Sequence, residues 1–164
     1  MILWNATRGA LIGFEPDRRL AAMIGAETGI PCTTTALVTV EYLRKRNFRR
    51  IGLVAQGSDV DGERLRETFA REGIDIVAGH NLGISDNFEA AGVSPEEIED
   101  HVLRLASTAK LDAVLIWSTN LAGHKLTAYM RENPCVPVLD SAALGILDAL
   151  HDLAAMDMET ARGR

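Results

Sequence analysis

Short apolar runs recur along this chain, and the spacing between them leaves room for a helix. The runs cover residues 2–4, 49–55, 74–77, 111–117 and 136–139. Most are apolar at successive positions rather than at alternate ones, which is typical of strands covered on both faces. Helical patterns lie around them at 15–28, 35–47, 59–72, 94–109, 123–133 and 141–153. Strands that alternate with helices predict an α/β fold of βαβ units around parallel sheet.

Local signals mark the ends of some of these helices. Ser94 stands before Pro95 and three residues before Glu97, a pattern that predicts a helix N-terminus. Gly29, with a proline two residues later, predicts the end of the helix over 15–28. Residues 156–164 are polar, and we expect them to form a frayed tail.

Composition and charge exclude several classes of protein. The chain has 164 residues, enough to bury a sizeable core, with a net charge of −6 and an isoelectric point near 5.2. Because no basic block offsets this acidic balance, binding to nucleic acid through phosphate contacts is disfavoured. No stretch approaches about 18 apolar residues in a row, so the sequence predicts no membrane partner.

The cysteines and the N-terminus indicate a compartment. Cys32 and Cys135 are too few for a disulfide framework, so we expect free thiols in a reducing environment. Residues 1–5 carry no charged segment before a long apolar stretch, so we expect no signal peptide. The prediction is a cytoplasmic protein.

The segments after the apolar runs carry the candidate chemistry, because ligands of open α/β sheets bind outside the carboxyl ends of the strands. These segments are rich in Thr, Ser, Asn and Gly, and they cover 5–9, 33–35, 56–59, 79–87, 118–121 and 140–141. Such donors at helix starts suit a carboxylate or another small anion. The glycine patterns of nucleotide sites are absent, as are H-E-x-x-H and C-x-x-C. We therefore expect neither a bound nucleotide nor a metal ion.

Two strand ends echo each other, and this suggests two similar halves. Residues 4–9 (WNATRG) and 117–121 (WSTNL) both place small polar residues between an apolar strand and a helix. Together with TTTAL at 33–37, RIGLV at 50–54, LGISDNF at 82–88 and PVLDSA at 137–142, they occur in a family-like order. The ordered set resembles the aspartate/glutamate racemase superfamily, and most closely its branch of maleate cis-trans isomerases and arylmalonate decarboxylases.

The resemblance implies two Rossmann-like parallel-sheet halves with the active-site cleft between them. Residues 1–55 and 138–155 would form the first half, and residues 56–137 the second. The family works without a cofactor at the carbon next to a carboxylate, by racemisation, cis-trans isomerisation or decarboxylation. The expected partner is therefore a small dicarboxylate or an α-substituted carboxylate. The chemistry needs a thiol whose thiolate forms readily near neutral pH.

This sequence departs from the family pattern at three places. Ser118 takes the position of the second-half cysteine, and Ala6 takes the position of the first-half cysteine. A Pro-Tyr pair, whose tyrosine donates to a substrate carboxylate, is replaced by Gln56-Gly57. The family has a further βα region before the strand at 2–4, so we expect an incomplete first half. Its open sheet edge would favour a homo-oligomer.

The resemblance and the strand-end positions define the candidate site. The catalytic candidate is Ser118, with the non-catalytic Ala6 at the other cysteine position. The candidate substrate-binding residues are Asn5, Thr7, Arg8, Gly57, Ser58, Asn87, Thr119 and Asn120.

Each candidate also has a purely structural interpretation. Ser118 could simply permit a tight turn, and Thr7, Thr119 and Asn120 could be helix N-caps. Arg8 could point into solvent, and Asn87 could be a turn residue. Cys32 could serve as a displaced thiol or as a small buried side chain. Two alternatives to an enzyme follow: a carboxylate-binding relative without catalysis, and a fragment without independent function.

Overall fold

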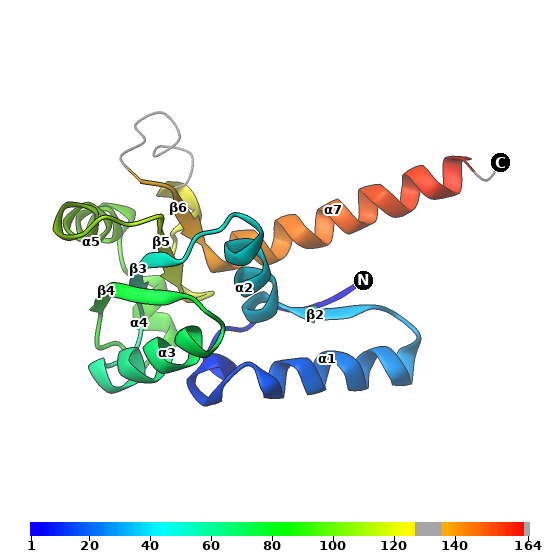
Figure 1. The fold of residues 1–164 in the computed structure, drawn as a ribbon, viewed down its shortest axis with the longest axis horizontal. Helices are drawn as coiled ribbons and strands as arrows, with labels where there is room; N and C mark the ends of the chain where they lie inside the picture. The colour runs from blue at the N-terminus through cyan, green and yellow to red at the C-terminus, as the bar shows by residue number, and fades with distance from the viewer. Residues whose placement is uncertain (127–135, 163–164) are drawn as a thin grey trace.

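Two parallel sheets organise the chain, as the computed structural model shows for residues 1–126 and 136–162, with side chains described up to residue 151 (Figure 1). The smaller sheet pairs β1 (Ile2–Trp4) with β2 (Cys32–Thr34). The larger one has the order β4-β3-β5-β6, from β3 (Arg50–Ala55), β4 (Asp75–Asn81), β5 (Ala113–Trp117) and β6 (Val138–Asp140). The expected α/β fold with parallel sheets in two halves is confirmed.

Strand pairing shows which segments share the larger sheet. Strand β3 pairs with β4 and β5, and β6 pairs with β5. Residues 50–55 and 138–140 are therefore part of the larger sheet. The division into residues 1–55 with 138–155 and residues 56–137 stays a prediction. The apolar pattern of 50–55 predicts a buried strand but holds no information about which neighbour it pairs with.

The helices follow their sequence signals closely. They are α1 (Glu15–Thr28), α2 (Thr35–Lys45), α3 (Asp59–Arg71), α4 (Asn87–Ala91), α5 (Pro95–Thr108) and α7 (Ser141–Arg162), with a short 3-10 helix η1 (Arg8–Ile12). Gly29 ends α1 at a φ of 67°, where a side chain would be strained. Ser94 Oγ accepts the N–H of Glu97 at 3.1 Å and so caps α5.

The last helix is longer than its sequence pattern. Helix α7 continues to Arg162, past residue 153. Most of the predicted helix over 123–133 and Cys135 lie outside the described residues. Strand β2 lies at the strand-end segment 33–35, although the polar Thr33 and Thr34 keep it out of the apolar runs.

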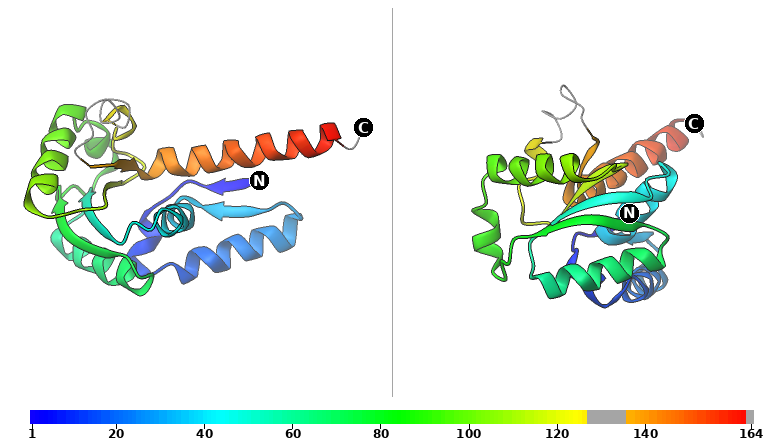
Figure 2. Two further views of the ribbon diagram at one scale, coloured as in Figure 1. Left: turned by 45° about the horizontal axis from the view of Figure 1, so that its top comes forward. Right: turned by 60° about the vertical axis from the view of Figure 1, so that its left-hand side comes forward.

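Alternate residues of the larger sheet contribute to two hydrophobic clusters on its opposite faces. Leu53, Leu115 and Trp117 face α2 and α3, and Val54 and Ile116 face α5. Figure 2 shows the larger sheet between α5 and α3, and the smaller sheet between α1 and α7. Helix α7 extends beyond the body of the molecule in every view.

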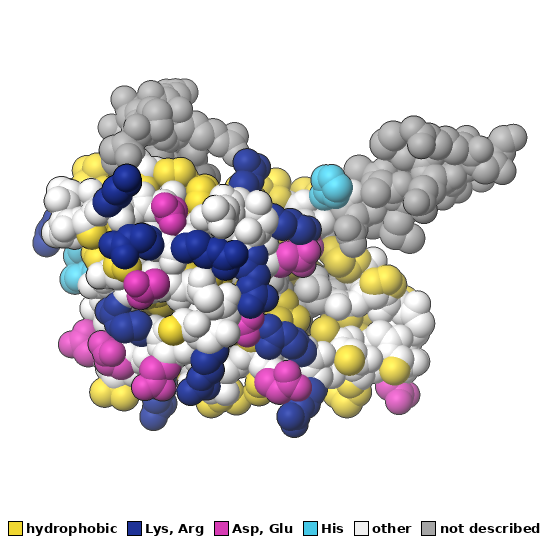
Figure 3. All heavy atoms as spheres, viewed as in Figure 1, with side chains coloured by type: hydrophobic (Ala, Val, Ile, Leu, Met, Phe, Trp, Pro, Cys, Tyr) yellow, Lys and Arg dark blue, Asp and Glu magenta, His cyan; other side chains and the backbone are white. Residues whose placement is uncertain are grey.

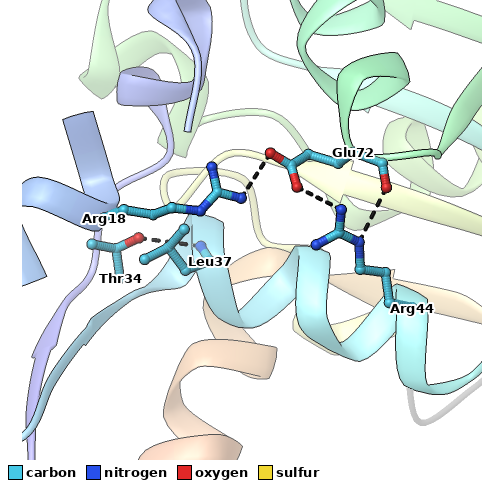
Figure 4. A network of polar contacts seen from close by, with 5 residues as sticks. All are labelled: Arg18, Thr34, Leu37, Arg44 and Glu72. Atoms are coloured by element: carbon cyan, nitrogen blue, oxygen red, sulfur yellow. Dashed lines mark hydrogen bonds and ion pairs between the residues drawn. The ribbon is translucent and has the colours of Figure 1, made fainter. Parts of the chain in front are cut away.

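An ion-pair network connects the helices beside the smaller sheet to the end of α3 (Figure 4). Glu72, directly after α3, accepts Arg18 of α1 and Arg44 of α2 through its two carboxylate oxygens, each at 2.7 Å. The Nε of Arg44 also donates to the backbone carbonyl of Glu72 at 3.1 Å. The Glu72 side chain is only 10% exposed, so these contacts are partly shielded from water. The network therefore links α1 and α2 to the end of α3.

The surface in Figure 3 shows basic and acidic side chains interspersed over α2, α3 and the ends of the larger sheet, rather than a field of one sign. Among the helices that the structure describes, none combines the length and apolar character needed to cross a bilayer.

Candidate functional site

A small hollow lies where the carboxyl ends of β1, β3 and β5 meet. Its lining comprises Thr7, Arg8, Leu11, Ala55, Gln56, Gly57, Asp61, Leu65, Trp117 and Ser118. The volume is about 30 Å³, enough for one or two groups the size of a water molecule. Residues 7–11 follow the smaller sheet and the others belong to the larger half, so the hollow lies between the two halves. Ligands of open α/β sheets bind at this place, outside the carboxyl ends of the strands.

A polar network surrounds Ser118 at the end of β5. The Ser118 hydroxyl donates to Oε1 of Gln56 at 2.7 Å and accepts the backbone N–H of Asn120 at 3.0 Å. The Asn120 amide donates to Gln56 Oε1 at 3.3 Å and to Oδ1 of Asn87 at 3.0 Å. The Gln56 amide donates to Asn87 Oδ1 at 3.2 Å. Three predicted site residues, Ser118, Asn87 and Asn120, are thus brought together by Gln56, which was not among the predicted site residues.

None of the side chains in this network carries a charge or acts as a base. Gln56 and both asparagines carry amides, which do not accept a proton near neutral pH. A serine nucleophile needs a base within hydrogen-bond reach to remove its proton. Here the Ser118 proton points to an amide oxygen instead. The network therefore orients Ser118 as a hydrogen-bonding group and does not activate it as a nucleophile.

The predicted residues of the first half divide between the hollow and the scaffold. Thr7 is buried at the start of η1, makes no capping bond with its side chain, and lines the hollow with the exposed Arg8. Asn5 instead accepts the Thr35 hydroxyl at 2.6 Å and links β1 to α2. Ala6 is half-buried and lies just before Thr7, outside the lining.

The segment after β3 also serves two purposes. Gly57 lines the hollow, whereas Ser58 caps α3 through a reciprocal pair of bonds with Asp61. Asp61 also lines the hollow, although sequence reasoning did not include it. The signal was present, because Ser58 and Asp61 have the spacing of a capping box, which turns the N3 side chain back over the strand end.

Cys32 does not take the place of the absent thiols. It begins β2, in register with Ile2, and so lies at the amino end of the smaller sheet. Its half-buried thiol has the Thr33 carbonyl as a weak acceptor at 3.8 Å. The hollow is at the opposite end, and Cys32 is not part of its lining.

Asp140 and Ser141 stand at the carboxyl end of β6, the strand next to β5, and neither lines the hollow. Asp140 is buried and accepts the N–H of Ala143 at 2.7 Å through Oδ1, as an N-cap does. Burial raises the pKa of its carboxyl above the usual 3.8, although the hydrogen bond from the backbone N–H of Ala143 acts in the opposite direction.

Thr119 is half-buried and outside the lining of the hollow. Within residues 1–126 and 136–151, no three His, Cys, Asp or Glu side chains are grouped to hold a metal ion.

The fold and the hollow define a class: parallel α/β proteins of two halves with a polar cleft at the strand ends. The sequence profile of the arylmalonate decarboxylase family matches residues 9–164. The chain belongs to this family. The expected branch of the aspartate/glutamate racemase superfamily is thereby confirmed.

Curated relatives and solved structures agree with this assignment. The chain is 28% identical over 124 residues to arylmalonate decarboxylase of Bordetella bronchiseptica, covering 75% of this chain and 52% of that one. It is 26% identical over 126 residues to maleate isomerase of Alcaligenes faecalis, covering 76% of this chain and 49% of that one. The chain thus spans about half the length of these relatives.

Two solved structures show the same fold. A variant of arylmalonate decarboxylase in liganded form superposes with a TM-score of 0.83 at 25% identity, covering 91% of this chain and 65% of that one. The maleate isomerase Iso(C200A) of Pseudomonas putida S16, solved with maleate, gives a TM-score of 0.83 at 18% identity, with coverage of 93% and 63%. The second likeness concerns the fold alone.

Proposed function

We propose that this chain binds a small dicarboxylate or an α-substituted carboxylate at the hollow between its halves, with one end of the molecule inside the hollow. On this proposal the family's cofactor-independent chemistry at the carbon next to the carboxylate is strongly impaired. The supporting observation is the network at Ser118, which keeps polar side chains at the strand ends but holds a hydroxyl where the chemistry needs a thiol.

The parts of the hollow have separate roles in this proposal. Arg8 supplies a guanidinium whose fork matches the two oxygens of a carboxylate. Thr7, with a side-chain hydroxyl that is not used as a cap, donates beside it. Ser118 stands at the reacting carbon, held by Gln56 and Asn120. Racemisation, isomerisation and decarboxylation all develop negative charge next to a carboxylate, which such donors stabilise.

The test compares binding and turnover in the same chain. Calorimetry measures the affinity for maleate, alkyl- and arylmalonates and aspartate, and product analysis measures their conversion. We expect measurable binding of at least one of them with slow or no conversion. The double variant Ala6→Cys/Ser118→Cys should raise conversion at least about tenfold, since a thiol ionises far more readily than a hydroxyl.

Ser107→Cys is the matched control, because Ser107 is exposed on α5 and lies away from the hollow. It adds a thiol without placing it at a strand end, so conversion should stay at the level of the unmodified chain. The proposal fails if none of these carboxylates binds.

A second candidate is a carboxylate-binding protein without catalysis. The observation in its favour is that the Ser118 hydroxyl donates its hydrogen bond to Gln56 Oε1, and an amide oxygen is too weak a base to remove that proton. This candidate predicts binding without conversion both in the unmodified chain and in the double cysteine variant. Conversion by the variant would exclude it.

A further inference from the structure

Two of the residues that line the hollow carry charge, and they stand on opposite halves. Arg8 begins η1, directly after the smaller sheet, and Asp61 lies in the first turn of α3, after β3. The remaining lining is apolar or neutral. A ligand in the hollow therefore meets a cation on one wall and an anion on the other.

The Asp61 carboxylate is held against the hollow by its neighbours. Both the N–H and the hydroxyl of Ser58 donate to Asp61 Oδ2 at 3.1 Å. A side chain at Gly57 would place its Cβ 2.6 Å from the same oxygen, so the carboxylate covers Gly57. Because both bonds from Ser58 end on Oδ2, the lone pairs of Oδ1 remain for a ligand.

A carboxylate at this place favours ligands that present a hydrogen-bond donor or a positive charge to it. An ionised carboxylate is an acceptor only, so a group beside it must donate a hydrogen bond or carry positive charge. A second carboxylate of a ligand would face a like charge there and be disfavoured. Arg8 has the opposite preference and pairs with a ligand carboxylate.

We propose that Asp61 determines specificity in this hollow, and that the chain prefers a small carboxylate bearing an ammonium or hydroxyl donor near its carboxyl group over one without a donor. This inference rests on the proposed carboxylate binding and selects, within that class, the α-substituted carboxylates. The hollow of about 30 Å³ also favours a small head group at its base.

The experiment uses pairs of ligands that differ by one donor. Calorimetry compares aspartate with succinate, and alanine and lactate with propionate. In the unmodified chain the donor-bearing member should bind at least about tenfold more tightly, the value of one charge-assisted hydrogen bond. In Asp61→Asn, which keeps an acceptor for Ser58, the ratio should fall to about twofold or less. Far-UV circular dichroism establishes that the variant is folded.

Asp59→Asn is the matched control, since it removes the same charge from the same turn of α3. Asp59 is exposed, accepts the Asn81 amide at 3.1 Å and does not line the hollow. The preference should survive in this variant. Equal affinities within each pair in the unmodified chain overturn the inference, while carboxylate binding and the proposed function stand. An equal loss in Asp59→Asn and Asp61→Asn overturns it as well. Absence of all carboxylate binding overturns the proposed function itself.

Discussion

Gln56 is the residue around which the polar side of the hollow is built. Its Oε1 accepts from both Ser118 and Asn120, and its amide nitrogen donates to Asn87. Gln56 is buried, so its amide does not exchange these partners freely for water. Each of the four side chains is therefore oriented by the others.

Replacement of the Gln56 amide should show that Gln56 and Ser118 stabilise the fold jointly. Gln56→Met removes the acceptor of the buried Ser118 hydroxyl, and the free energy of unfolding should fall by about 1–3 kcal/mol. Urea denaturation of Gln56→Met, Ser118→Ala and the double variant measures the loss. We expect the double variant to lose less than the sum of the single ones, because both remove the same bond. Strict additivity would contradict a shared network.

Asp140 and Asp112 should give opposite pH dependences. Burial raises the pKa of Asp140 in the folded chain. Below about pH 3.8 the carboxyl is protonated in both states and does not affect the free energy of unfolding. As the pH rises from there to the raised pKa, the carboxyl ionises more readily in the unfolded chain, so the free energy of unfolding decreases. Asp140→Asn, which cannot ionise, should therefore gain stability relative to the unmodified chain between pH 4 and pH 7.

Asp112 provides the comparison of opposite sign. The backbone N–H groups of Arg50 and Arg49, each 2.8 Å from its Oδ2, lower the pKa of Asp112. Its stabilisation is present above 3.8 and is lost as the pH falls through the lowered pKa. Asp112→Asn should therefore lose stability at pH 7, and the loss should shrink at acid pH. Urea denaturation across this range tests both variants, and parallel curves for the two would contradict the assignment.

At the scale of elements, the ion-pair network of Glu72 connects α1 and α2 to the end of α3. Glu72 binds two guanidiniums that belong to different helices, and a single pair would connect only one of them. Because α1 follows residues 7–11 and α3 carries Asp61, the network links segments on both sides of the hollow.

Glu72→Gln should weaken this arrangement. The amide loses the charge that pairs with Arg18 and Arg44, and the free energy of unfolding should fall by about 1–2 kcal/mol, since the guanidiniums are more than two-fifths exposed. Glu67→Gln is the control, because Glu67 is 72% exposed and lies 3.8 Å from Arg71. It should change stability by less than about 0.5 kcal/mol. A similar loss in both variants would show that Glu72 acts only through net charge.

Much at this scale could be predicted from the sequence. The helix starts at Ser94 and the stop at Gly29 depend on a few adjacent residues, so local patterns are sufficient. Strand pairing depends on contacts between distant segments, so the pattern of 50–55 predicts a strand but not its pairing with β4 and β5. For the same reason Asn5 was predicted as a ligand contact, although its partner Thr35 is thirty residues away. The capping-box spacing of Ser58 and Asp61 is visible in the sequence, but the position of Asp61 over the hollow depends on the turn after β3.

At the scale of the whole molecule, one hydrophobic cluster spans both halves. It includes Ala10 and Phe14 beside the smaller sheet together with Phe69 and Trp117 of the larger half. Phe69 is fully buried, and its ring meets those of Phe14 and Trp117 edge to face, with centroids 5.3 and 5.2 Å apart. Because the cluster is shared, we expect the halves to unfold together.

Phe69→Ala should reveal this shared core. The cavity and the two lost ring contacts should lower the free energy of unfolding by about 3–5 kcal/mol. Phe88→Ala is the control, since Phe88 is 91% exposed and its loss should cost less than about 0.5 kcal/mol. Circular dichroism and tryptophan fluorescence should give coincident transitions for the unmodified chain. Separate transitions would contradict a shared core.

The unequal size of the two sheets has a consequence for slow local motion. The ladder of β1 and β2 has three residue pairs, whereas β3 is paired along both of its edges. Amide protons of β3 and β5 should therefore exchange with deuterium only on global opening, and those of β1 and β2 much sooner. Mass spectrometry of deuterium uptake measures this order. Thr7 and Arg8, which follow β1, would then move more often than Ser118 at the end of β5, so the wall of the hollow beside the smaller sheet would be the more mobile one.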